Sequence, residues 1–178
     1  AGIPFNDNGD HFGMRDYHVY KMNRPDDFEA KDLGKILDID DVPWAKRQMW
    51  APDIAKKGDT YYFYFPAKDR DDIFRIGVAT GKSPQGPFTA ESGYIEGSYS
   101  IDPAVYNDNG EYYMYYGGIW GGQLQKYRAN KYNTKNDLLN DDEPAFGPIV
   151  AKMSEDMKSF ATDPQEIKIL DENNNALL

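Results

Sequence analysis

Two carboxylates stand beside prolines in matching segments of the chain, about fifty residues apart. Asp53 follows Pro52, and Asp102 precedes Pro103 in the run Ser-Ile-Asp-Pro-Ala-Val. Carboxyl groups act as general acids and bases, and a neighbouring proline keeps the backbone extended and fixed. Asp102 is therefore the candidate for catalytic work. Asp53 has the reversed order, Pro-Asp, which favours a structural role or a place at the rim of a substrate site.

Several other side chains could bind a hydroxyl-rich ligand. Trp50 and Trp120 are candidate sugar platforms, because an indole combines an apolar face with a polar edge. Four glycines surround Trp120, so the backbone could approach a ligand there, or the segment could be a glycine-rich turn with a packed tryptophan. Gln123, Arg75 and His18 could bond hydroxyls, although each could also be structural, and His18 could be a satisfied core histidine.

Composition narrows the class of protein. The 178 residues carry no cysteine and two histidines, so no disulfide, thiolate metal site or multi-histidine zinc site is expected, and no metal ligand is assigned. A net charge of −10 argues against nucleic acid and anionic membranes as partners. No run of about 18 apolar residues predicts a membrane span, and no signal segment opens the chain. The location, cytoplasmic or exported, stays open.

The elements that must position these residues are short strands. We predict strands at 16–22, 34–38, 52–55, 60–66 and 74–80, with a fourth strand of that unit near 94–95. The next unit has strands at 101–106, 111–117, 123–129 and about 166–170, with a polar insertion at 132–159. Helical signals are weak, and Asn109-Gly110 is the strongest hairpin signal.

The repeated unit predicts an all-β fold built from propeller blades. Each copy has a carboxylate-bearing strand, a turn and an aromatic strand, and units of roughly 40–50 residues are typical of blades. We expect a half blade at about 14–40 and blades at about 48–97 and 98–172, which is two and a half blades. The aromatic strands are apolar on both faces, as sandwiched sheets require, whereas a β-sandwich would alternate more cleanly. Uncovered sheet faces suggest further polypeptide, in sequence or as a second copy.

Together these motifs resemble glycoside hydrolase family 43. The resemblance is carried by Trp-Ala-Pro-Asp-Ile at 50–54, the Tyr-Tyr-x-Tyr-Phe-Pro strand after it, the Ile-Gly-Val-Ala to Ser-Pro-x-Gly-Pro-Phe stretch at 76–88, and Ser-Ile-Asp-Pro-Ala at 100–104. Gly-Gly-Ile-Trp-Gly-Gly-Gln at 117–123 is similar to the family's β-xylosidase and α-L-arabinofuranosidase members.

The resemblance implies a five-bladed β-propeller and an inverting glycosidase acting on xylo- or arabino-oligosaccharides. Asp102 matches the aspartate that orients the general acid and tunes its pKa. The general base is expected before residue 1 and the general acid after Leu178, so the chain alone is expected to be catalytically incomplete. No cofactor is required, although the full propeller could hold a structural calcium. Two alternatives stay open: a non-catalytic carbohydrate-binding propeller and a protein-interaction propeller.

Overall fold

The protein consists of three antiparallel sheets that follow one another along the chain. The computed structural model describes residues 11–26, 28–118, 121–137 and 145–175. A two-stranded sheet contains β1 (Asp16–Lys21) and β2 (Lys31–Asp38). The first four-stranded sheet contains β3 (Asp53–Lys57), β4 (Thr60–Lys68), β5 (Phe74–Gly81) and β6 (Thr89–Ala90). The second contains β7 (Ala104–Asp108), β8 (Glu111–Tyr116), β9 (Ile149–Lys152) and β10 (Gln165–Glu166).

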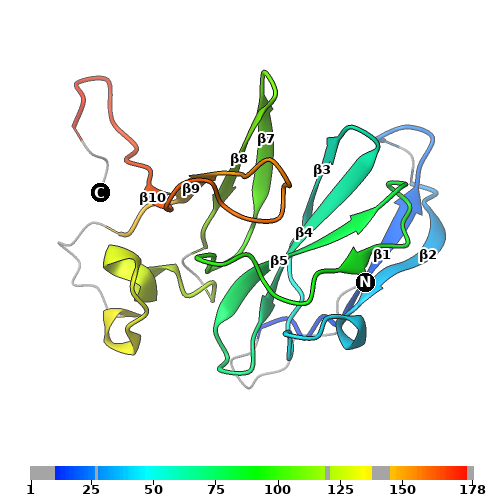
Figure 1. Ribbon diagram of the computed structural model, residues 1–178, viewed down its shortest axis with the longest axis horizontal. Helices are drawn as coiled ribbons and strands as arrows, with labels where there is room; N and C mark the ends of the chain where they lie inside the picture. The colour runs from blue at the N-terminus through cyan, green and yellow to red at the C-terminus, as the bar shows by residue number, and fades with distance from the viewer. Residues whose placement is uncertain (1–10, 27, 119–120, 138–144, 176–178) are drawn as a thin grey trace.

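Each four-stranded sheet is a simple meander in which sequential strands are neighbours. Figure 1 shows the three sheets in a row, with β1–β2 at one end and β9–β10 at the other. The first strands of the two large sheets, β3 and β7, are in contact. This arrangement is that of consecutive propeller blades, whose first strands gather on one side.

Tight turns set the register of both leading hairpins. Lys57 pairs with Thr60 across Gly58-Asp59, and Asp108 pairs with Glu111 across Asn109-Gly110. Asn109 and Gly110 have φ of 51° and 97°, the left-handed pair that a two-residue hairpin loop requires. The hairpin predicted at Asn109-Gly110 is therefore confirmed.

The aromatic strand β4 is buried on both faces. Tyr64 belongs to a core shared with the second sheet, which includes Met114 and Ile149. Phe63 and Phe65 point the other way, into a core shared with β1–β2 that includes Tyr17 and Leu37. Alternate residues of a strand face opposite sides, so a middle sheet must be apolar on both. Three stacked sheets replace the two of a β-sandwich.

Four details of the strand prediction were wrong or shifted. The segment 123–129 is not a strand: it forms most of η2, a 3₁₀ helix over Leu124–Asn130. The third strand of the second sheet is instead β9, inside the segment predicted as an insertion at 132–159. The edge strand of the first sheet is Thr89–Ala90, although the backbone N–H of Ile95 still bonds to Ile76 O. The last strand, Gln165–Glu166, only begins the predicted range 166–170.

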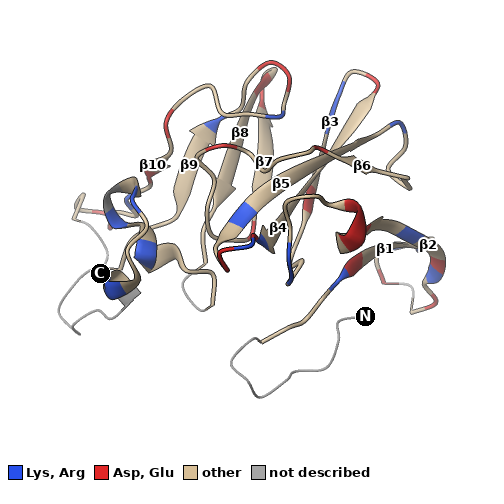
Figure 2. Cartoon of the chain, turned by 60° about the horizontal axis from the view of Figure 1, so that its bottom comes forward, with Lys and Arg blue, Asp and Glu red and all other residues tan. Residues whose placement is uncertain are grey.

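Helical structure in the described residues is limited to 3₁₀ turns. These are η1 (Ile39–Asp41), η2 and η3 (Thr134–Asp137). Figure 2 shows that Lys and Arg gather on η2 and η3, whereas Asp and Glu lie on η1 and on turns between strands. Within the described ranges, no helix has the length and apolar character needed to cross a bilayer.

Candidate functional site

Asp102 lies just before β7, on a backbone that is strained on both sides of Ile101. Ser100 and Asp102 have φ of 64° and 56°, the left-handed region that residues with a side chain rarely occupy. The residue before a proline normally adopts an extended conformation, so Pro103 makes the geometry of Asp102 still less usual. Such conformations cost about 1–3 kcal/mol each and persist where the surroundings enforce them.

Hydrogen bonds to the glycine-rich segment after β8 enforce this conformation. Ser100 is fully buried, and its Oγ accepts a hydrogen bond from the backbone N–H of Gly118 at 2.9 Å. The backbone N–H of Gly117 donates to the carbonyl of Ile101 at 2.8 Å. The strand end and the glycine segment are therefore held together at both residues that precede Asp102.

Two of the glycines leave room for the side chain of Ile101. A Cβ on Gly118 would lie 2.5 Å from Cγ1 and Cδ1 of Ile101, and one on Gly122 would lie 2.6 Å from Cγ1. Ile101 forms a small buried cluster with Trp50 and Phe74. The close approach that these glycines allow is thus made by Ile101, within the protein.

The carboxylate of Asp102 faces solvent on one side and the glycine segment on the other. A Cβ on Gly118 would lie 3.4 Å from its Oδ2. Partial desolvation raises the pKa of Asp102 above its ordinary value, and among the described residues no hydrogen-bond or ion-pair partner offsets this effect. An unpaired carboxylate on a strained backbone is the arrangement expected of a functional group.

The two tryptophans named as sugar platforms differ in outcome. Trp50 is 8 % exposed, its Nε1 donates to Phe12 O at 2.7 Å, and its ring packs 4.7 Å from that of Phe74. The structure therefore gives Trp50 a packing role next to Phe74 and Ile101, with little open ring surface. Trp120 lies outside the described residues.

Gln123 and Asp53 connect the two large sheets. The Gln123 amide accepts from Phe74 N and donates to Asp72 O, both at 2.9 Å. Oδ2 of Asp53, at the start of β3, accepts from Val105 N in β7 at 2.6 Å. Asp53 thus makes a structural contact between the two sheets, one of the two roles that its sequence favoured, and the amide of Gln123 is used inside the protein.

Arg75 and His18 are also engaged in structural contacts. Arg75 donates to Asp69 Oδ2 at 3.1 Å and to Ser98 O at 3.2 Å, and its guanidinium lies 4.8 Å above the Tyr94 ring. Nδ1 of His18 lies 2.9 Å from Asp32 Oδ2, across the β1–β2 sheet. Neither side chain is bonded to Asp102.

Phe12 is a candidate binding residue that the sequence reasoning missed. Its side chain is 54 % exposed, and its ring lies edge-on to that of Trp50, 6.5 Å between centroids. The neighbouring His11 ring lies against the site where a Cβ of Gly121 would be, at 3.0 Å. His11 and Trp50 thus both lie against Gly121. No repeat or motif marks residues 11–12.

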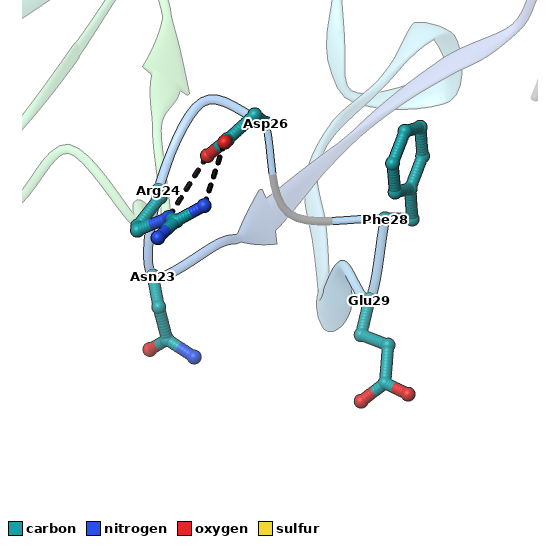
Figure 3. Close-up of a pocket in the computed structure, with 5 residues that line it drawn as sticks. All are labelled: Asn23, Arg24, Asp26, Phe28 and Glu29. Carbon is teal, nitrogen blue, oxygen red and sulfur yellow. Dashed lines mark hydrogen bonds and ion pairs between the residues drawn. The ribbon is translucent and has the colours of Figure 1, made fainter.

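A separate pocket lies in the loop between β1 and β2. Figure 3 shows its lining residues, with the Arg24 guanidinium bound to the Asp26 carboxylate at 2.6 Å; the pocket is formed by Asn23, Arg24, Asp26, Phe28 and Glu29. It contains none of the predicted site residues. In the part of the chain that the structure describes, no group of three or more His, Cys, Asp or Glu is placed to hold a metal.

The chain is similar to members of a known protein family. The family model described as "Glycosyl hydrolases family 43" matches residues 15–167. A xylosidase/arabinosidase of Bacteroides ovatus is 52 % identical over 99 % of this chain and 55 % of its own length. Xylosidase/arabinosidase 43A of Humicola insolens is 49 % identical over 94 % of this chain and 54 % of its own length. The chain thus spans about half the length of these relatives.

Solved structures show the same fold. A family 43 β-xylosidase/α-arabinofuranosidase from a compost microbial metagenome, in complex with xylotriose and in calcium-free form, superposes with a TM-score of 0.89. It is 59 % identical and covers 98 % of this chain and 54 % of its own. The RS223 β-xylosidase gives 0.91 at 52 % identity, over 98 % of this chain and 55 % of its own. The protein is all-β and forms about two and a half blades of a five-bladed β-propeller, as the sequence predicted.

Proposed function

This chain belongs to glycosyl hydrolases family 43, and on that premise we propose that the whole protein hydrolyses glycosidic bonds of xylan- or arabinan-derived oligosaccharides. The relatives named xylosidase/arabinosidase, at about half identity over nearly all of this chain, support the substrate class. A family 43 enzyme of Xanthomonas citri was solved with xylose, and the compost enzyme with xylotriose. The proposed substrate is a xyloside or an arabinofuranoside.

The observation that carries the proposal is the unpaired carboxylate of Asp102. Its backbone is strained and its pKa is raised by partial desolvation, yet among the described residues no partner compensates. A purely structural carboxylate gains from a partner, as Asp53 does from Val105 N. The geometry of Asp102 therefore fits a carboxylate that interacts with a catalytic group rather than with a structural partner.

We assign Asp102 the role of orienting the general acid and tuning its pKa. A nearby carboxylate charge disfavours ionisation of the acid, so the acid stays protonated until the leaving oxygen needs its proton. In an inverting mechanism a general base activates water on the opposite face of the sugar, with the two catalytic carboxyls about 6.5–9.5 Å apart. We propose that the base and the acid belong to polypeptide beyond these 178 residues.

We propose Phe12 as the main residue that contacts the sugar. Its exposed ring, held by the Trp50 indole, offers an apolar face to the C–H face of a pyranose. Arg75, Gln123 and His18 make internal contacts, and in this proposal we assign them to no substrate hydroxyl. A structural calcium in the full propeller stays a proposal, and we assign no ligand to it from the described residues.

Hydrolysis of aryl β-xyloside and aryl α-L-arabinofuranoside by the full-length protein tests this function. We expect turnover of at least one substrate, and proton NMR of the first product should show the anomer opposite to that of the substrate. Binding of xylo-oligosaccharides without turnover would favour the alternative, a non-catalytic carbohydrate-binding propeller. A retained anomeric configuration would contradict the inverting mechanism.

A further inference from the structure

Gln123 is a third residue of the Asp102 region with a left-handed backbone. Its φ is 62°, and it stands at the start of η2 without a side-chain capping bond. Its amide instead reaches the first sheet, where it accepts from Phe74 N and donates to Asp72 O. An amide that satisfies one backbone donor and one acceptor about fifty residues away fixes the distance between the two segments.

The turn to which the Gln123 amide binds is itself held by hydrogen bonds and ion pairs. Asp69 is 8 % exposed, and its Oδ1 accepts from the backbone N–H groups of Asp71 and Ile73. The Asp72 carboxylate is bound by Arg47 at 2.8 Å and by Lys46 at 3.1 Å. The turn between β4 and β5 therefore acts as a fixed point on the first sheet, to which the glycine segment of the second is attached.

Two contacts lead from Gln123 to Ile101, the residue before Asp102. Gly122, directly before Gln123, lies against Cγ1 of Ile101. Phe74, whose N–H is bound by the Gln123 amide, packs in one cluster with Trp50 and Ile101. Loss of the amide would free both the glycine segment and the backbone of Phe74, which together confine Ile101.

We propose that Gln123 is a positioning residue for Asp102: its amide clamps Gly121-Gly122 to the first sheet and thereby fixes the carboxylate through Ile101. The inference rests on the role proposed above for Asp102, and it adds a residue that contacts neither the carboxylate nor a substrate. The two amide bonds also account for a residue with a side chain at this left-handed position.

Gln125 provides a matched control two residues further along η2. It is 4 % exposed, its Oε1 accepts from Phe146 N at 2.8 Å, and its Nε2 donates to Phe146 O at 3.1 Å. Its amide therefore makes the same two kinds of bond as that of Gln123. Gln125 binds to the connection between β8 and β9 of the second sheet, away from the β4–β5 turn. Gln125→Met should therefore reproduce the loss of stability without displacing Asp102.

The test is an NMR titration of the Asp102 carboxyl in the full-length protein with ¹³C-labelled aspartate, the resonance being assigned by its absence in Asp102→Asn. In Gln123→Met the carboxyl gains water, so its midpoint should fall toward the ordinary aspartate value. Gln125→Met should leave it unchanged. Equal midpoints in the two variants would overturn the proposal.

Kinetics separate this inference from the role of Asp102. Gln123→Met should lower kcat with KM little changed, and should move the alkaline limb of the pH–rate profile to lower pH. If Asp102→Asn kept full activity, the role of Asp102 would fail while the NMR result still decided whether Gln123 positions it. Should Gln123→Met not fold, Gln123→Asn replaces it: its neutral amide is one methylene too short to make both bonds, and asparagine tolerates the left-handed backbone. The same comparison of midpoints with Gln125→Met applies.

Discussion

Gly118→Ala is the substitution that most directly probes the support of Asp102. The added Cβ would lie 2.5 Å from Cγ1 and Cδ1 of Ile101 and 3.4 Å from Oδ2 of Asp102. The first distance is far inside van der Waals contact, so Ile101 must move. It cannot move freely, because it is packed against Trp50 and Phe74. The substitution therefore strains the core and displaces the carboxylate together.

The expected size of the effect follows from overpacking. Forcing one carbon into a filled core costs about 1–3 kcal/mol of unfolding free energy. Ile101→Ala removes both clashing atoms and by itself costs about 2–5 kcal/mol as a cavity. The double variant should be more stable than the sum of the single effects predicts, by about 1–2 kcal/mol, because the new methyl group occupies part of that cavity.

Urea unfolding of the four proteins gives this coupling energy, provided that the slope of free energy against urea stays constant. Gly93→Ala is the control, because a Cβ there meets no atom within 4 Å and its backbone is not left-handed. It should change stability by less than about 0.5 kcal/mol. If Gly118→Ala matched Gly93→Ala, or if the two Gly118 and Ile101 effects were simply additive, the proposed packing beneath Asp102 would be wrong.

Three further substitutions test other parts of the site. Asp53→Ala leaves the Val105 N–H without its acceptor and should cost about 1–3 kcal/mol in urea unfolding; no loss would mean that this bond does not join the sheets. Folding raises the pKa of Asp102, so its ionisation destabilises the native state as pH rises through that pKa. Asp102→Asn should therefore be more stable than the parent protein at pH 7, by a small margin since solvent screens an exposed group, and should gain nothing below about pH 3; a constant difference across pH would contradict this. Phe12→Ala should raise KM for xylo-oligosaccharides several-fold in the full-length protein with little change in unfolding, and an unchanged KM would exclude Phe12 from substrate contact.

Local signals were sufficient to predict the leading hairpins. Asn109-Gly110 specifies its turn almost alone, and a strand apolar on both faces, such as β4, predicts a sheet between two others. The second sheet was harder, because its third strand comes after a long connection and is only four residues long, Ile149–Lys152. The segment 123–129 contains apolar residues that are also compatible with a strand, and tertiary packing of Leu124 and Tyr127 decided for a 3₁₀ helix.

From the sequence, the site could be predicted only at Asp102, where a single residue type in a repeated unit indicated a function. Asp102 stood out by its place in a repeated unit, but its left-handed backbone could not be read from residue types, since glycine or asparagine would normally mark such a position. Gln123 looked available for a ligand because its partners, Asp72 and Phe74, are about fifty residues away. Phe12 was missed because exposure next to Trp50 is a property of the fold.

Turnover of an aryl β-xyloside or α-L-arabinofuranoside by the full-length protein and its Asp102→Asn variant is the most direct test of the central claim. Asparagine keeps the size of the side chain and tolerates the left-handed backbone, so urea unfolding at pH 7 should confirm an intact fold. We expect kcat to fall by about 10²–10⁴-fold with KM little affected, because the charge that tunes the acid is lost. Full activity in a folded Asp102→Asn variant would contradict the catalytic assignment of Asp102.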